Sequence, residues 1–143
     1  MNLLENTQLY RTYGAHPAGQ GWTFRVYAPN ARDAALAGDF NGWQPAPMQH
    51  QGGDWVLTVP DAQPGQCYKY VITGADGQVR WKADPYGTYA QLRPDTASRL
   101  YDVSGFRWHD DVWRERRRET PLTDGPLNIY EVHPGSWRRD EDG

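Results

Sequence analysis

Short segments of alternating apolar and polar residues, each closed by glycine or proline, restrict this chain more than any other feature of its sequence. In the segment 22–28, Trp22, Phe24 and Val26 alternate with polar residues, as on a strand with one buried face. Similar strand-like segments follow at 34–37, 55–59, 67–73, 79–82 and 100–103. Strands at this spacing, separated by turn residues, predict an all-β fold, an immunoglobulin-like antiparallel β-sandwich.

The segment 38–43, Gly-Asp-Phe-Asn-Gly-Trp, follows one of these strands and contains the strongest turn signal. Asparagine and glycine tolerate the positive φ that a tight turn requires, so Asn41-Gly42 predicts a turn. Trp43 comes directly after it, and its large ring suits either the core or an exposed binding surface. Both interpretations stay open for Trp43, whereas Trp81 lies between two charged residues and is expected to be exposed.

Aromatic residues with a polar group dominate the composition, with seven tryptophans and nine tyrosines against three phenylalanines. Such rings are common on sugar-binding and interface surfaces, although a small sandwich also uses them in its core. The net charge of −3 lacks the positive field that binding to nucleic acid requires. With Cys67 as the single cysteine and no long apolar segment, we expect a cytoplasmic protein without membrane association.

The chain is expected to divide into an N-terminal leader, the sandwich, a helix with a linker, and the start of another domain. The leader contains several glycines and shows no periodicity, and the helix is predicted at 112–118. The strand-like segment 127–133 has no partner strand nearby, so we interpret it as the first element of a larger domain. The four parts are 1–20, 21–105, 106–126 and 127–143.

Several motifs occur in a recognisable order. They are Trp-Thr-Phe-Arg-Val-Tyr-Ala-Pro-Asn-Ala (22–31), Gly-Asp-Phe-Asn-Gly-Trp (38–43), Tyr-Lys-Tyr (68–70), Lys-Ala-Asp-Pro-Tyr (82–86) and Leu-Arg-Pro-Asp-Thr-Ala-Ser (92–98). Together they resemble the N-terminal starch-binding module of bacterial glycogen branching enzymes, which belongs to carbohydrate-binding module family 48. The segment 129–139, Ile-Tyr-Glu-Val-His-Pro-Gly-Ser-Trp-Arg-Arg, resembles the first strand of the (β/α)8 catalytic barrel of glycoside hydrolase family 13.

The resemblance implies a parent glycosyltransferase of glycogen biosynthesis. Such an enzyme cleaves an α-1,4-glucan, holds the chain as a covalent intermediate and transfers it to a 6-hydroxyl, which makes an α-1,6 branch. This retaining chemistry needs two carboxylates, which the family takes from later barrel strands. The acids Asp39, Asp54, Asp76, Asp84 and Glu131 match no such motif, and isolated acids on turns ordinarily face solvent. We therefore assign no catalytic residue and expect this chain alone to lack transferase activity.

The resemblance also places an α-glucan site on the module. Trp43 and Trp81 match two positions where rings stack on sugars, and Lys69 matches a lysine that hydrogen-bonds sugar hydroxyls. By their spacing from Asp84-Pro85, two further residues fall on polar loop positions that close the site. With Asn41 as an assisting residue, the candidate site consists of Asn41, Trp43, Lys69, Trp81, Thr96 and Ser98. The expected partners are α-1,4-glucan chains and the catalytic barrel, without a cofactor or metal.

These assignments have alternatives. Lys69 also fits a lysine whose stem covers apolar surface without a ligand, and Thr96 and Ser98 fit ordinary turn residues. The module as a whole also fits a structural domain that supports the barrel with little or no sugar binding. A regulatory glycogen-targeting subunit is disfavoured by the barrel-like tail. The remaining tryptophans are assigned to the core (Trp22, Trp55) or to contact with the barrel (Trp108, Trp113, Trp137).

Overall fold

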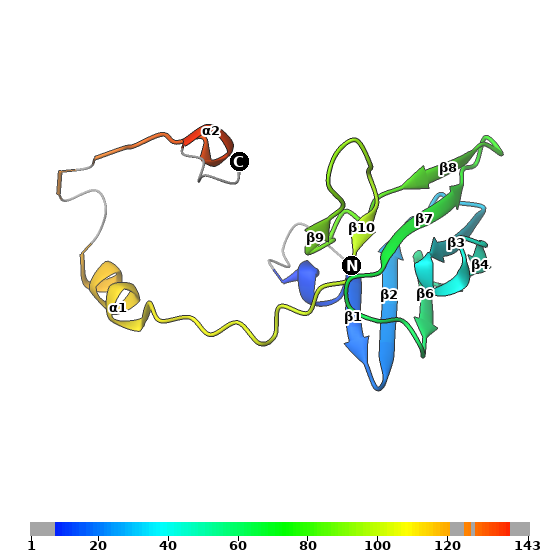
Figure 1. The fold of residues 1–143 in the computed structure, drawn as a ribbon, viewed down its shortest axis with the longest axis horizontal. Helices are drawn as coiled ribbons and strands as arrows, with labels where there is room; N and C mark the ends of the chain where they lie inside the picture. Colours follow the sequence, from blue (N-terminus) through cyan, green and yellow to red (C-terminus); the bar gives the residue numbers. More distant parts are fainter. Residues whose placement is uncertain (1–7, 121–124, 127, 138–143) are drawn as a thin grey trace, which may run out of the picture. The chain divides into compact units, whose positions relative to one another are not determined.

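The computed structural model describes residues 8–120, 125–126 and 128–137, and the chain forms two units, one ending at Gly105 and the other beginning at Phe106 (Figure 1). The first unit contains two antiparallel sheets and short 3-10 helices. Its four-stranded sheet has the order β1 (Gly14–Ala18), β2 (Gly21–Tyr27), β6 (Asp54–Val59) and β5 (Gln49–Gln51). The prediction of an all-β, antiparallel architecture is therefore confirmed.

The six-stranded sheet is arranged around β7, which is hydrogen-bonded along both of its edges. Its order is β4 (Ala46–Pro47), β3 (Asp33–Gly38), β7 (Cys67–Thr73), β10 (Ser98–Arg99) and β9 (Tyr89–Ala90), and β8 (Val79–Lys82) also pairs with β7. The last strand, predicted at 100–103, lies earlier in the chain, because β10 consists of Ser98 and Arg99. Leu100, which follows β10, is buried.

Strand β1 corrects the expectation that residues 1–20 form a leader outside the sandwich. It pairs with β2 over its whole length, from Gly14 opposite Arg25 to Ala18 opposite Gly21. The glycines that suggested an irregular segment instead make the connection, because Gly19 has a φ of +61° and lets the chain reverse in two residues. Residues 1–7 of the expected leader lie outside the described residues.

The core lies between the two sheets and follows the predicted alternation. Along β2, Trp22, Phe24 and Val26 are buried, while the intervening residues face outward. The opposing layer comes from alternate residues of β3 and β7, and Trp55 of β6 completes the aromatic part of the core. Trp22 and Trp55 are buried, as predicted. The core also includes Ala34, Leu36, Met48, Ala62, Tyr68, Tyr70 and Leu100.

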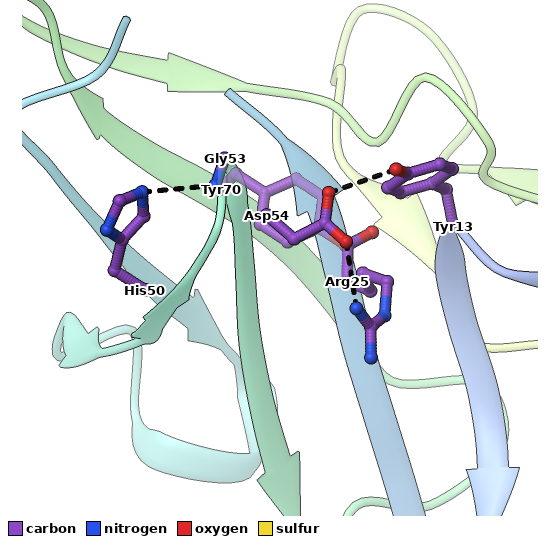
Figure 2. Close-up of polar contacts among 6 residues, drawn as sticks. All are labelled: Tyr13, Arg25, His50, Gly53, Asp54 and Tyr70. Atoms are coloured by element: carbon purple, nitrogen blue, oxygen red, sulfur yellow. Dashed lines mark hydrogen bonds and ion pairs between the residues drawn. The ribbon is translucent and has the colours of Figure 1, made fainter. Parts of the chain in front are cut away.

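Polar contacts at one end of the sandwich join its elements (Figure 2). The Asp54 carboxylate accepts a hydrogen bond from the Tyr13 hydroxyl at 2.9 Å and forms an ion pair with Arg25 at 2.8 Å. The Tyr70 hydroxyl of the six-stranded sheet lies 3.4 Å from the backbone carbonyl of Arg25 and shares its single proton between this carbonyl and the Asp84 carboxylate. Burial, with Asp54 as a second cause, raises the pKa of Tyr13 to about 12.

The second unit contains helix α1 (Asp111–Glu119), which confirms the predicted helix, and a short helix α2 (Pro134–Trp137). The strand expected at 127–133 is corrected, because its described part, 128–133, forms no strand; a strand needs a paired neighbour to satisfy its backbone. Trp108, Trp113 and Trp137 are all exposed. Residues 121–124 of the expected linker, Leu127 and residues 138–143 lie outside the described residues. Within the described helices, none is long and apolar enough to cross a membrane.

Candidate functional site

The pairing of β7 with β8 places two of the predicted site residues on the outer face of the six-stranded sheet. Along β7, Tyr68 and Tyr70 point into the core, so Lys69 and Val71 lie on the opposite, outer face of the sheet, where Val71 is covered and only 7% exposed. Trp81 of β8 lies directly opposite Val71 and therefore shares that outer face. Its indole is 46% exposed, which confirms the predicted exposure of this ring.

The turn after β3 brings a second indole to the same surface. Asn41 closes this turn, because its side chain accepts a hydrogen bond from the Gly38 N–H at 2.9 Å and donates one to the Leu36 carbonyl at 3.1 Å. Trp43 then adopts a φ of +61°, and its backbone N–H donates to the Gly38 carbonyl. Asn41 thus builds the turn and does not line the cleft described below, and its expected part in sugar binding stays a prediction.

Asp39 fixes the direction of the Trp43 ring. One carboxylate oxygen accepts the indole Nε1–H at 2.9 Å, and the other accepts the backbone N–H of Cys67, at the start of β7, at 2.7 Å. Sequence reasoning treated Asp39 as an ordinary acid on a turn. The available signal was local: an exposed indole N–H needs an acceptor, and Asp39 lies four residues before it.

Trp43 and Trp81 form a tilted pair of rings, with centroids 6.5 Å apart and planes at 33°. This contact settles the two interpretations of Trp43, because the ring lies on the outer surface and not in the core. Beside the rings, Lys69 Nζ donates a hydrogen bond to Thr96 Oγ1 at 2.8 Å. The ammonium group of Lys69 is therefore directed at the loop between β9 and β10, and the side chain does more than cover apolar surface with its stem.

These four side chains line an open cleft of about 440 Å³, which we call the Trp43–Trp81 cleft. Its far wall is the loop between β9 and β10, visible in Figure 1, which contributes Gln91, Asp95 and Thr96. Gln91 and Asp95 were not predicted, because only the folding of the loop reveals which of its side chains face Lys69. Among the described residues that line the cleft, Asp95 carries the single carboxylate. The two indole rings and the Lys69 ammonium donor suit the binding of a ligand rich in hydroxyl groups.

Ser98 does not lie where the predicted site places it. It is 4% exposed and lies outside the cleft, because it pairs with Tyr68, whose side chain points into the core. Its hydroxyl accepts a hydrogen bond from the Asp84 N–H at 2.9 Å. Spacing along the chain placed Ser98 in the right loop but on the wrong side of the sheet.

Asp84 is likewise corrected from a solvent-facing acid to a buried one. Its carboxylate accepts hydrogen bonds from the hydroxyls of Tyr68 and Tyr70, at 2.7 Å and 3.2 Å, and from the backbone N–H of Tyr86. Burial raises the pKa of Asp84, and these hydrogen bonds partly oppose the shift. Asp84 thus joins the β8–β9 connection to β7 and supports the loop that carries Thr96.

A model of the family described as Carbohydrate-binding module 48 (Isoamylase N-terminal domain) matches residues 12–87, more than half of the chain. The chain belongs to carbohydrate-binding module family 48. Among the described residues of this family-48 module, no group of three histidine, cysteine or acidic side chains is placed to hold a metal ion.

Two curated relatives of the family-48 module are described as 1,4-alpha-glucan branching enzymes. The 1,4-alpha-glucan branching enzyme GlgB of Rubrobacter xylanophilus is 47% identical over 145 residues, which cover 96% of this chain and 20% of the relative. The GlgB of Geobacillus stearothermophilus is 40% identical over 152 residues, which cover 99% of this chain and 24% of the relative. The chain thus spans about a fifth to a quarter of the length of these relatives. The predicted resemblance to glycogen branching enzymes is confirmed.

Solved structures share the fold of the family-48 module. A Klebsiella pneumoniae pullulanase complexed with maltotriose matches with a TM-score of 0.55 at 25% identity, over 63% of this chain and 9% of that one. The pullulanase from Bacillus acidopullulyticus matches with a TM-score of 0.54 at 25% identity, over 63% of this chain and 12% of that one.

Proposed function

We propose that the family-48 module binds α-1,4-glucan chains, such as glycogen and maltooligosaccharides, in the Trp43–Trp81 cleft. The observation that carries this proposal is a pair of tilted indoles, the exposed one of Trp81 and the partly buried one of Trp43, with a lysine and a threonine hydroxyl beside them. The family match and the glucan-acting relatives support the same ligand class.

The cleft suits the chemistry of an α-glucan. Each glucose unit has an apolar C–H face that stacks on an aromatic ring, and its hydroxyl groups require directional partners. The chain is curved, and two rings inclined at 33° follow such a curve better than a flat platform. The Lys69 ammonium group has three N–H donors and uses one on Thr96, so two remain for sugar hydroxyls.

We further propose that the module serves a cytoplasmic branching enzyme, since its relatives are 1,4-alpha-glucan branching enzymes. In that enzyme, cleavage of α-1,4 links and transfer to form α-1,6 branches would be carried out by residues outside this chain. The contribution of the module is to hold and orient a glucan chain. Its cleft contains one carboxylate among the described residues, whereas retaining transfer uses two.

A titration with β-cyclodextrin or maltoheptaose, followed by tryptophan fluorescence, tests the glucan site. We expect saturable binding by the wild-type chain. Trp43→Ala and Trp81→Ala should each weaken it roughly tenfold or more, because each removes a stacking surface.

The matched control is Trp108→Ala, which removes an exposed indole from the second unit and should leave the affinity unchanged. Thermal unfolding shows whether each variant is folded. If folded Trp43→Ala and Trp81→Ala variants bind as tightly as the wild type, the cleft is not the glucan site. If the Trp43→Ala and Trp81→Ala substitutions lower the melting temperature and leave the glucan affinity unchanged, the module is a structural support.

A further inference from the structure

A second group of aromatic side chains lies on the outer face that carries the cleft. Strand register places Cys67 of β7 opposite Arg99 of β10, and Arg99 opposite Tyr89 of β9. Cys67 and Lys69 are two residues apart on one strand and so face the same way. Arg99 and Tyr89 therefore share the outer face with Lys69.

Tyr89 contacts both Arg99 and Tyr101, and we call these three residues the Tyr89–Tyr101 group. The rings of the two tyrosines have centroids 5.7 Å apart, and the Arg99 guanidinium carbon lies 5.4 Å from the centre of the Tyr89 ring. The tyrosines are 51% and 55% exposed, so part of each side chain stays accessible beside these contacts.

The backbone and side-chain contacts of this group hold it in place without a ligand. Arg99 Nε donates to the Gly65 carbonyl at 3.1 Å, and Thr88 Oγ1 donates to the Tyr101 carbonyl at 3.0 Å. A surface that is already arranged loses less conformational entropy when a ligand binds.

The group is continuous with the Trp43–Trp81 cleft. Gln91 lines the cleft and follows Tyr89 by two residues. Its backbone N–H donates to the Ala97 carbonyl at 2.9 Å, and this hydrogen bond extends the pairing of β9 with β10 by one residue. Alternation along this extended segment puts Gln91 and Tyr89 on one face. From β7 to β9 the distance is two strand spacings, about 10 Å, which a chain of a few glucose units spans.

We propose that Tyr89, Tyr101 and Arg99 form a second subsite for the α-1,4-glucan chain that occupies the cleft. The inference rests on the proposed function of the cleft and adds a preference for longer chains. A glucan is the favoured occupant because each side chain of the group combines a flat surface with hydrogen-bond donors, and because the surface continues from the cleft. A three-unit chain that stacks on both indoles of the cleft has at most one unit left for the Tyr89–Tyr101 group, whereas a longer chain can occupy both places.

Calorimetric titrations of the 143-residue chain with maltotriose and with maltoheptaose test the subsite. Tyr89→Ala should weaken maltoheptaose binding roughly three- to tenfold, as expected for a lost stacking surface, and leave maltotriose binding unchanged. Tyr89→Phe, which keeps the ring, should retain most of the maltoheptaose affinity. Tyr27→Ala is the matched control, because Tyr27 is exposed on the other sheet.

The two ligands separate the possible outcomes. If Tyr89→Ala weakens both sugars equally, or neither, the second subsite is overturned while the cleft stands. If the Tyr27→Ala control shows the same selective loss, the subsite is also overturned. If the wild-type chain binds neither sugar, the proposed function of the cleft fails, and the subsite fails with it.

Discussion

Asp39 makes two hydrogen bonds that connect the Trp43 indole to the first residue of β7. This anchoring matters because Trp43 has a φ of +61°, a conformation that costs a bulky residue on the order of 1–3 kcal/mol and persists only where surrounding contacts offset that cost. The Trp43 N–H, bonded to the Gly38 carbonyl, adds a third constraint. The position of one stacking ring thus depends on a carboxylate outside the residues that line the cleft.

Asp39→Ala should release the Trp43 ring and weaken maltoheptaose binding roughly threefold or more. It should also lower the free energy of unfolding by about 1–3 kcal/mol, because the Cys67 N–H and the indole N–H both lose their acceptor. Fluorescence titration and urea denaturation measure the two effects. Asp61→Ala, at another exposed acid, is the control. A folded Asp39→Ala variant with wild-type affinity would show that the anchor has no part in binding.

The loop between β9 and β10 combines a binding role and a structural role in residues two positions apart. Thr96 meets Lys69 in the cleft, whereas Ser98 faces inward and accepts the Asp84 N–H. Ser98 belongs to β10 and lies opposite Tyr68, so it shares the inward direction of that side chain, whereas Thr96 lies in the loop before the strand and does not follow the strand's alternation.

Ser98→Ala should therefore affect stability and not binding. It leaves the buried Asp84 N–H without its partner, and we expect the free energy of unfolding to fall by about 1–3 kcal/mol with maltoheptaose affinity unchanged. Thr96→Val, at the exposed position, should do the reverse and weaken binding with little effect on stability. Urea denaturation and the sugar titration, applied to both variants, distinguish these roles. Weaker binding by a fully stable Ser98→Ala variant would return Ser98 to the set of sugar contacts.

The elements of this fold differ in how far the sequence predicts them. Alternation is visible within a single segment, so β2, β6 and β7 were predicted, together with the buried rings of Trp22 and Trp55. Strand β1 was missed because its glycines look like breaks until the hairpin closes around Gly19. The orientation of Ser98 depends on pairing with Tyr68, which lies 30 residues earlier, and no local pattern records such a pairing.

At the scale of the whole sandwich, Tyr13 joins the segment before β1 to Asp54 on β6, and Tyr70 joins one sheet to the other through Arg25. Burial and the nearby Asp54 raise the pKa of Tyr13 from 10.0 to about 12. The folded chain therefore holds this proton more tightly than the unfolded chain does. The corresponding stabilisation is complete below pH 10 and is lost as the pH rises toward 12.

We expect the free energy of unfolding to fall between pH 10 and pH 12, with Tyr13 contributing on the order of 2 kcal/mol to the decrease. The pKa values of Tyr68 and Tyr70 are also raised by burial, so other tyrosines add to the same trend. Tyr13→Phe should make the decline shallower without removing it. Urea denaturation at several pH values in this range measures the slope for both proteins. Identical slopes would mean that the Tyr13 hydroxyl has no coupling to folding.

The four side chains that carry the proposed glucan site, Trp43, Lys69, Trp81 and Thr96, come from the outer face of the six-stranded sheet and from the turn and loop beside it, and none of them belongs to the core. Their replacement during evolution would leave the two sheets and their packing unchanged. A descendant of this module could therefore keep every strand and lose its ligand, or exchange one sugar for another, through a few substitutions on one surface. Within such a family, the residues at these few positions are a better guide to what a member recognises than the shared fold.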